Sequence, residues 1–322
     1  MARSPLPSAL DAVLERFTFM VLDGALATEL ERIGFELNDA LWSARLLREA
    51  PETITRVHRA WFEAGADCAI TASYQASLEG FRRHGVSEQQ ALRLIRRSVA
   101  LARRARDDFR RAHADDCRPR PLVAASVGPY GAALADGSEY RGDYTDDERT
   151  LQAFHRPRLA ALMSERPDLL AIETLPSLGE ARALSRLLPE FPGARAWVSF
   201  TTRDARHISD GTPIRDCAAL LAECPQVVAI GVNCTAPHHV GELIGEIRAV
   251  SDRPVIVYPN AGEHYDPHQG GWQPQATPPA GTSPFGELAR QWQAAGAAII
   301  GGCCRTTPED IRAIAAQRRR LR

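Results

Sequence analysis

The sequence predicts one α/β domain over residues 1–322, folded as a (β/α)8 TIM barrel. Eight apolar runs rich in β-branched residues lie along the chain, and a segment with helical periodicity separates nearly every consecutive pair. Eight alternating units in this length fit such a barrel, which typically needs about 250 residues plus insertions. An open, doubly wound sheet is the alternative architecture. No Gly-x-Gly-x-x-Gly motif follows the first run, which counts mildly against it.

The eight runs are the predicted strands. They span residues 19–23, 68–73, 122–127, 169–173, 196–200, 227–232, 255–258 and 297–301. Several of them follow a helix end and a small residue, as at Gly65 and Gly296. A glycine there stops the helix and lets the chain turn back into the sheet.

Three segments between the strands carry the clearest helical pattern. Residues 51–64 place Ile54, Val57 and Trp61 at helical spacing, and residues 88–111 repeat the pattern over a longer stretch. Residues 213–221 open with a proline, which the first turn of a helix tolerates. We expect helices over all three segments.

Two stretches lack periodicity and are rich in turn-forming residues: 128–145 after the third strand and 260–284 after the seventh. Loops that follow barrel strands lie on the face where binding and catalysis occur. Loops of this length in a compact domain are usually functional. We therefore expect both stretches to border a functional site.

Composition favours small-molecule chemistry. The 39 basic and 40 acidic residues give a formal net charge of -1, which offers no reason to expect nucleic acid or an anionic membrane as a partner. The N-terminus has no apolar signal-peptide core, and no run approaches the ~20 apolar residues of a membrane helix. We expect a cytoplasmic protein.

Three of the seven cysteines follow predicted strands. Cys234 follows the sixth strand, and Cys303 and Cys304 follow the eighth. In a chain expected to be cytoplasmic, such thiols fit a soft metal ion, Zn²⁺, better than disulfides. Three protein ligands leave one coordination position open, where a substrate can bind and react. The other four cysteines are expected to be packed or idle thiols.

Polar residues occupy the matching ends of other strands. Asp23 ends the first strand, Thr71 lies near the end of the second, Glu173 ends the fourth and Asn260 follows the seventh. Each alone has a plain structural explanation, such as a turn or a helix cap. Because the carboxyl ends of barrel strands share one rim, and the last strand lies beside the first, together they favour one pocket.

The ligand set indicates a reaction class. Three thiolates give a zinc centre a formal charge of -1, which makes it a poor Lewis acid for water and argues against a hydrolase. The same centre suits a fourth thiolate, because coordination deprotonates a thiol while the anionic complex keeps its sulfur nucleophilic. The sequence therefore predicts alkyl transfer onto a thiol.

Two motifs carry a family resemblance. Gly231-Val232-Asn233-Cys234 and Gly301-Gly302-Cys303-Cys304-Arg305-Thr306 resemble the signature of the homocysteine S-methyltransferase family. The resemblance spans nearly the whole chain, except the first sixteen residues and 266–284. Its further blocks lie at 22–30, 70–76, 126–131, 137–144, 173–176 and 258–265, and they look most like the bacterial and plant branch that uses S-methylmethionine.

The resemblance implies a (β/α)8 barrel in which a Zn²⁺ ion activates homocysteine for conversion to methionine. Its implied zinc ligands are Cys234, Cys303 and Cys304. It also implies that Asp23 and Glu173 accept the homocysteine ammonium, while the Gly24 and Ala25 amides and the Thr71 hydroxyl bind the carboxylate. We assign Tyr130, Asn260 and Glu263 to the side of the sulfonium donor.

Several alternatives remain open. S-adenosylmethionine could replace S-methylmethionine as donor, and a selenocysteine methyltransferase would differ only in its acceptor. A non-catalytic barrel with a structural zinc is a different class, although a structural site normally closes with a fourth protein ligand.

Overall fold

Eight parallel strands form the central sheet of the computed structural model, which describes residues 9–35, 43–144, 147–262, 264–266, 271–273 and 284–321. The strands are β1 (Met20–Val21), β2 (Cys68–Ile70), β3 (Leu122–Val127), β4 (Leu169–Leu175), β5 (Ala196–Phe200), β6 (Val227–Asn233), β7 (Val255–Tyr258) and β10 (Ala297–Ile300). Their order is β1-β10-β7-β6-β5-β4-β3-β2. All eight were predicted from the sequence.

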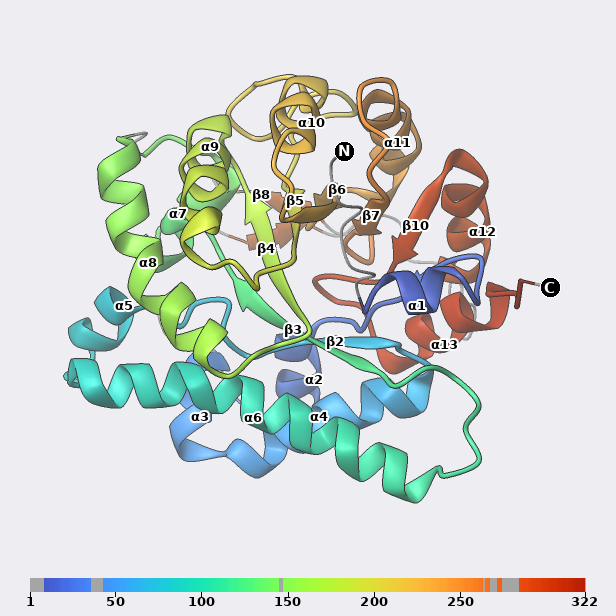
Figure 1. The fold of residues 1–322 in the computed structure, drawn as a ribbon, viewed down its shortest axis with the longest axis horizontal. Helices are drawn as coiled ribbons and strands as arrows, with labels where there is room; N and C mark the ends of the chain where they lie inside the picture. The colour runs from blue at the N-terminus through green and yellow to red at the C-terminus, as the bar shows by residue number, and fades with distance from the viewer. Residues whose placement is uncertain are drawn as a thin grey trace.

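The sheet closes into a barrel between its first and second strands. A parallel bridge pairs Leu22 with Cys68, and Asp67 N–H donates to the Val21 carbonyl at 2.7 Å. β1 pairs with β10 on its other side, so the last barrel strand lies beside the first. The predicted (β/α)8 barrel is thereby confirmed (Figure 1).

Helices surround the barrel on its outside (Figure 1). The longer ones are α4 (Pro51–Ala64), α6 (Glu88–Ala112), α8 (Glu148–Ser164), α9 (Leu178–Leu187), α10 (Ile214–Ala222), α11 (Val240–Arg248), α12 (Phe285–Ala295) and α13 (Pro308–Gln317). Shorter ones are α1 (Asp11–Leu14), α2 (Leu26–Arg32), α3 (Ser43–Glu49), α5 (Leu78–Arg83) and α7 (Tyr130–Leu134). The three helices predicted from periodicity agree with α4, α6 and α10 to within one residue at each end.

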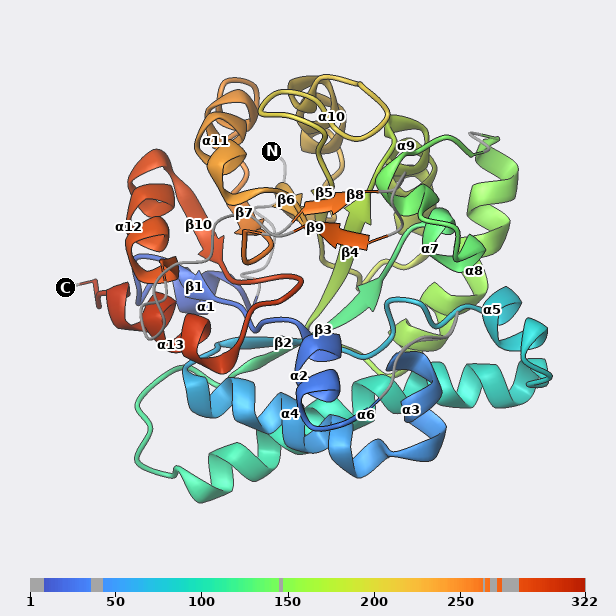
Figure 2. The ribbon, with the colours of Figure 1, turned by 180° about the vertical axis from the view of Figure 1, so that it is seen from behind.

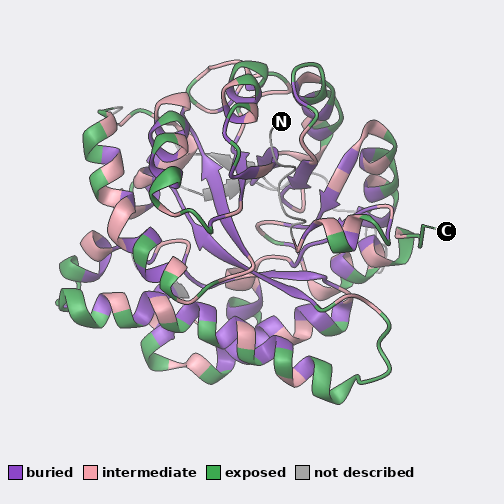
Figure 3. Cartoon of the chain, in the orientation of Figure 1, coloured by how far each residue is buried: buried purple, intermediate pink, exposed green. Residues whose placement is uncertain are grey.

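Most buried side chains belong to two layers, and Figure 3 colours the buried residues purple along the strands and on parts of the helices. The larger layer packs the helices against the outside of the sheet. The smaller fills the barrel interior, where Met20, Leu22 and Trp197 meet Val13 and Phe17 from the α1 segment. Alternation along β1 places Met20 and Leu22 inside and Val21 outside.

One supersecondary element was not predicted. β8 (His264–Asp266) and β9 (Gly271–Gln273) form an antiparallel hairpin in the segment between β7 and α12 (Figure 2). Within the described parts of the chain, no helix combines the length and the apolar character needed to cross a membrane.

Candidate active site

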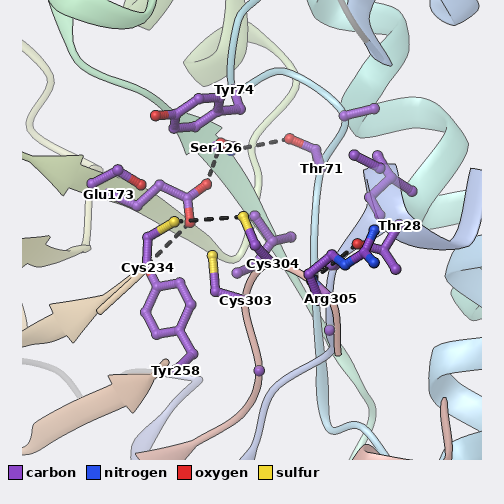
Figure 4. Close-up of a pocket in the computed structure, with 18 of the residues that line it drawn as sticks. Thr28, Thr71, Tyr74, Ser126, Glu173, Cys234, Tyr258, Cys303, Cys304 and Arg305 are labelled. Carbon is purple, nitrogen blue, oxygen red and sulfur yellow. Dashed lines mark hydrogen bonds between the residues drawn. The ribbon is translucent and has the colours of Figure 1, made fainter. Parts of the chain in front are cut away.

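Three thiols meet where β6 and β10 end. The Sγ atoms of Cys234, Cys303 and Cys304 all lie within 4.8 Å of one another, and the Cys234 and Cys304 sulfurs are 3.5 Å apart (Figure 4). β7 joins the two strands, because Cys303 N–H donates to the Pro259 carbonyl at 2.8 Å and Cys234 N–H to the Tyr258 carbonyl at 3.3 Å. The sequence prediction that these three cysteines lie together is met by the fold.

The backbone near the thiols adopts uncommon conformations. Cys234, Thr174 and Arg305 have φ angles of 50°, 60° and 67°, in the left-handed region that residues with a side chain rarely occupy. Such conformations cluster at functional sites, where the surrounding structure holds them in place. Gly24, which lies near these residues, is tightly packed: a Cβ at this position would lie 2.7 Å from the Trp61 ring, so a larger residue would force its neighbours to shift.

The three thiols shift one another's pKa. Hydrogen bonds from Cys234 and Cys304 hold the pKa of Cys303 well below its usual range. The hydrogen bond to Cys303, with burial, raises the pKa of Cys234, and the hydrogen bonds to Cys234 and Cys303, with burial, raise the pKa of Cys304. The cluster therefore favours a thiolate at Cys303, stabilised by its two neighbours.

The cluster suits a zinc ion. Sulfurs bound tetrahedrally at about 2.3 Å from zinc lie about 3.8 Å apart. The Cys234 and Cys304 sulfurs are 3.5 Å apart, and all three sulfurs lie within 4.8 Å of one another. The potential metal-binding group found in the described residues consists of these three cysteines alone, so it leaves a fourth position open. The geometry thus fits a three-thiolate centre that can accept one exogenous ligand.

A cavity of about 210 Å³ opens beside the thiols. Glu173 lies two residues before the end of β4, is 6% exposed and lines the cavity. Its Oε1 accepts from the Ser126 hydroxyl and its Oε2 from the Tyr258 hydroxyl at 3.1 Å. Burial raises the pKa of Glu173 to about 8, and the charge of Cys303 adds to the rise. A cationic ligand would oppose that shift and favour the carboxylate.

Asp23 lies beside the cavity but not among the described residues that line it. Its side chain is 2% exposed, and Oδ2 accepts from Ile70 N–H at 2.8 Å. Its buried Oδ1 has no partner within the described residues, and burial raises the pKa of the carboxyl well above its usual value. An orphaned carboxylate oxygen is a vacant acceptor for a donor group.

The groups predicted to bind a carboxylate already make hydrogen bonds of their own. Ala25 N–H donates to Thr306 Oγ1 at 3.2 Å. Thr71 Oγ1 accepts from Ser126 N–H at 3.0 Å and lies 2.7 Å from Ser73 Oγ, whose proton goes to the Ser126 carbonyl. Gly24, Ala25 and Thr71 all line the cavity, so a ligand carboxylate would reach them by exchanging these bonds.

Of the residues assigned to the donor side, Tyr130 and Asn260 belong to the described part of the chain. Tyr130 packs its ring 5.0 Å from the Phe154 ring, and its N–H donates to Glu180 at 2.6 Å. Asn260 is buried, with Oδ1 lacking a partner within the described residues. Neither is among the described residues that line the cavity, and Glu263 lies outside the described residues. Their donor contacts stay predictions.

Sequence reasoning missed several residues that shape the site. Tyr140 lines the cavity, and its hydroxyl lies 3.7 Å from Cys234 Sγ. Asn233 accepts from Thr174 N–H at 2.8 Å, and its Nδ2 faces Cys303 Sγ at 3.9 Å. The available signals were the position of Asn233 beside a predicted ligand and that of Tyr140 in a loop expected to border the site.

Comparisons with known proteins agree with this geometry. The family model described as homocysteine S-methyltransferase matches residues 20–318. The Bacillus subtilis protein named homocysteine S-methyltransferase YbgG is 53% identical over 311 residues, covering 96% of this chain and 98% of its own. The selenocysteine Se-methyltransferase of Brassica oleracea is 44% identical over 308 residues, covering 92% of this chain and 88% of its own.

A solved structure extends the match to three dimensions. The metallated form of the Escherichia coli homocysteine methyltransferase MmuM superposes with a TM-score of 0.87 at 49% identity, covering 96% of this chain and 100% of its own. The barrel, the three-thiol cluster and the full-length matches agree with one another. The chain therefore belongs to the homocysteine S-methyltransferase family.

Proposed function

We propose that this protein transfers a methyl group from S-methylmethionine to the sulfur of homocysteine, giving methionine, with Zn²⁺ held by Cys234, Cys303 and Cys304. The observation that carries the proposal is the convergence of three thiols on a cavity whose wall includes the buried carboxylate of Glu173. Such thiols need a reducing compartment, and we place the reaction in the cytoplasm.

The chain's own residues supply the binding groups for homocysteine. Bound to the three thiolates, zinc would hold the substrate sulfur as a nucleophilic thiolate. Glu173 and the orphaned Oδ1 of Asp23 are acceptors for the ammonium, which would lower the cost of keeping these buried carboxyls charged. The Gly24 and Ala25 amides with Thr71 remain the proposed donors to the carboxylate.

Methyl transfer itself needs alignment rather than acid or base catalysis. The homocysteine sulfur forms a bond to the methyl carbon while the bond from that carbon to the sulfonium sulfur breaks, and the electron pair stays on the departing sulfur. With S-methylmethionine both products are methionine. Holding the two sulfurs in line within a cavity converts a bimolecular step into an effectively unimolecular one.

One alternative acceptor has specific support. The plant relative named selenocysteine Se-methyltransferase covers nearly the same length, so selenocysteine is a second candidate acceptor for the same site. A purely structural zinc fits less well than a catalytic one, because a structural site normally has four protein ligands. The described ligand group has three residues and lies beside a cavity.

The test is methionine formation by reduced, zinc-loaded protein. Homocysteine is supplied with S-methylmethionine, S-adenosylmethionine or betaine in parallel, and selenocysteine replaces homocysteine in a second series. Fastest turnover of homocysteine with S-methylmethionine supports the proposal. No turnover with any donor, in protein shown to hold one zinc per chain, would overturn it in favour of a structural zinc.

A further inference from the structure

We propose that Arg305 and Glu31 form a subsite at the mouth of the cavity for the α-amino acid end of the methyl donor. The guanidinium would pair with the donor carboxylate and the Glu31 carboxylate with the donor ammonium. This inference rests on the proposed function, because it assumes a sulfonium amino acid as the second substrate.

Both residues line the same cavity as the thiols, and both are exposed, whereas Glu173 and Thr71 on that cavity's wall are buried. The cavity thus has a deep end and an open end, and Arg305 and Glu31 mark the open end. Within its described lining, Arg305 is the one arginine or lysine, and Glu31 is the one carboxylate besides Glu173. The open end therefore carries a matched pair of opposite charges.

Arg305 has a backbone conformation that an arginine rarely adopts. Its φ of 67° is a conformation that glycine would adopt without steric cost, yet the chain places an arginine there directly after the thiol of Cys304. Its N–H donates to Thr28 Oγ1 at 3.0 Å, which ties it to α2 (Figure 4). An uncommon conformation retained beside reacting groups points to a role for the side chain.

α2 brings the opposite charge to the same rim. Thr28 and Glu31 are three residues apart on this helix, so they share a face, and both line the cavity. The contact between Arg305 and Thr28 therefore also sets Arg305 relative to Glu31. A guanidinium suits a carboxylate because its planar donors match the two oxygens.

Homocysteine and the methyl donor are both zwitterionic amino acids, and the way each must enter the cavity assigns Arg305 and Glu31 to the donor. Homocysteine has to place its sulfur at the thiol cluster, where Glu173 at the deep end of the cavity and Asp23 beside the cavity are the buried acceptors for its ammonium. The donor then enters through the mouth, with its methyl directed at that sulfur and its amino acid end trailing. Two methylene groups separate the sulfonium from the α-carbon, which keeps the positive sulfur away from the guanidinium.

The experiment compares Arg305→Gly, Arg305→Lys and Glu31→Gln with the wild type. Arg305→Gly removes the charge while favouring the native φ, so the protein should melt at the same or a higher temperature. Arg182→Ala, which removes an exposed arginine on the outer helix α9, is the matched control. Three donors are used at saturating homocysteine: S-methylmethionine, its analogue without the carboxylate, (3-aminopropyl)dimethylsulfonium, and its analogue without the ammonium, (3-carboxypropyl)dimethylsulfonium.

We expect Arg305→Gly to raise the KM for S-methylmethionine about tenfold or more, the loss typical of one charge-assisted pair. The KM for homocysteine and the metal content should not change, Arg305→Lys should be intermediate, and Arg182→Ala should match the wild type. The increase in donor KM caused by Arg305→Gly should disappear with the carboxylate-free donor. The increase caused by Glu31→Gln should disappear with the ammonium-free donor.

Equal penalties with the intact and truncated donors, an unchanged KM for S-methylmethionine, or a raised KM for homocysteine would each overturn the subsite. Calorimetric titration of S-methylmethionine into the zinc-loaded protein separates this inference from the proposed function. If the wild type forms no methionine but binds S-methylmethionine, and Arg305→Gly loses that binding, the subsite stands while the proposed reaction fails. If the wild type does not bind it, the subsite fails as well.

Discussion

Glu173 combines two properties that rarely occur together: it is buried beside three thiols, and it lines the cavity. Glu173→Gln keeps the size of the side chain but removes the charge that an ammonium would meet. We expect homocysteine to bind at least about tenfold more weakly, because a charge-assisted bond is lost. Zinc should be retained, since the carboxylate is not part of the thiol cluster.

Metal content and the KM for homocysteine, measured on the same preparation, check this prediction. Glu223→Gln, at an exposed position after α10, is the control and should behave like the wild type. Loss of zinc in Glu173→Gln would contradict the assignment of Glu173 to the substrate rather than to the metal.

Cys303 tests whether the metal serves chemistry or stability. Cys303→Ser should abolish zinc binding and methyl transfer together, because a hydroxyl does not ionise at neutral pH and is a poor ligand for zinc. The fold should survive, since Cys303 is only partly buried at the edge of the barrel-interior cluster and serine has nearly the same size. Zinc analysis and thermal melting give the two readouts, with the exposed Cys117→Ser as control. Loss of the folded state would show that the metal is structural.

At the level of single residues, the sequence predicted the positions of side chains that lie near or just after the end of a strand. Cys234 and Cys303 follow strands whose apolar patterns are clear and Glu173 lies near the end of another, so the barrel alone brings them to one rim. Tyr140 could not be placed this way, because its position depends on the path of a loop without periodic pattern.

Whole elements were predictable where apolar residues repeat regularly. α4 begins and ends as the sequence indicates, because a proline occupies its first turn and Gly65 ends it with φ of 110°. The β8–β9 hairpin gave no such signal, because its strands have three residues each and lie among glycines and prolines. Short strands in such a segment cannot be told from a loop by periodicity.

Glu180, in α9, joins three elements around the loop that carries Tyr140. Its Oε1 accepts from Tyr130 N–H at the start of α7 and from His155 Nε2 in α8, each at 2.6 Å, and its Oε2 accepts from the Tyr144 hydroxyl. All these groups are buried or partly buried, so removal of the carboxylate leaves donors without partners.

We therefore expect Glu180→Ala to lower the free energy of unfolding by about 3 kcal/mol or more, the sum of several unpaired buried groups. Glu190→Ala is the matched control: it breaks the exposed pair with Arg156 and should cost less than about 1 kcal/mol. Urea unfolding of both variants measures the difference. Equal losses would mean that the buried network does not hold these helices together.

At the scale of the whole molecule, parallel strand direction explains why distant residues meet. β1 and β10 are neighbours although most of the chain separates them, and this places Asp23 near Cys303. The pattern of strands made this closure predictable. The packing of Val13 and Phe17 into the barrel interior was not, because the first sixteen residues carry no family signal and the helical spacing of Leu10, Val13, Leu14 and Phe17 does not indicate which surface they pack against.

Two fully buried histidines link global stability to pH. Burial lowers the pKa of His58 in α4 to about 4, and the ring nitrogens of His58 have no partner within the described residues. Burial, with the charge of Arg158, also lowers the pKa of His155 to about 4. In the unfolded chain both should titrate near their ordinary value of about 6.5.

Through these two histidines the unfolded state binds more protons than the folded state between about pH 6.5 and pH 4, whereas the raised pKa of the buried Glu173 and Asp23 acts in the opposite direction over this range. The histidine contribution to stability is therefore fully present above pH 6.5 and falls as the pH drops towards 4, by roughly 3 kcal/mol for each histidine, and it is read from the difference between the wild type and the histidine variant. Urea unfolding of reduced, metal-free protein at a series of pH values measures the slope. His58→Leu should show about half of the histidine-dependent slope, because a neutral apolar side chain removes that linkage, while the exposed His84→Gln should follow the wild type. Parallel curves for His58→Leu and the wild type would contradict this prediction. They would show that His58 is protonated as readily in the folded protein as in the unfolded chain, so that its buried site in α4 accommodates the positive charge.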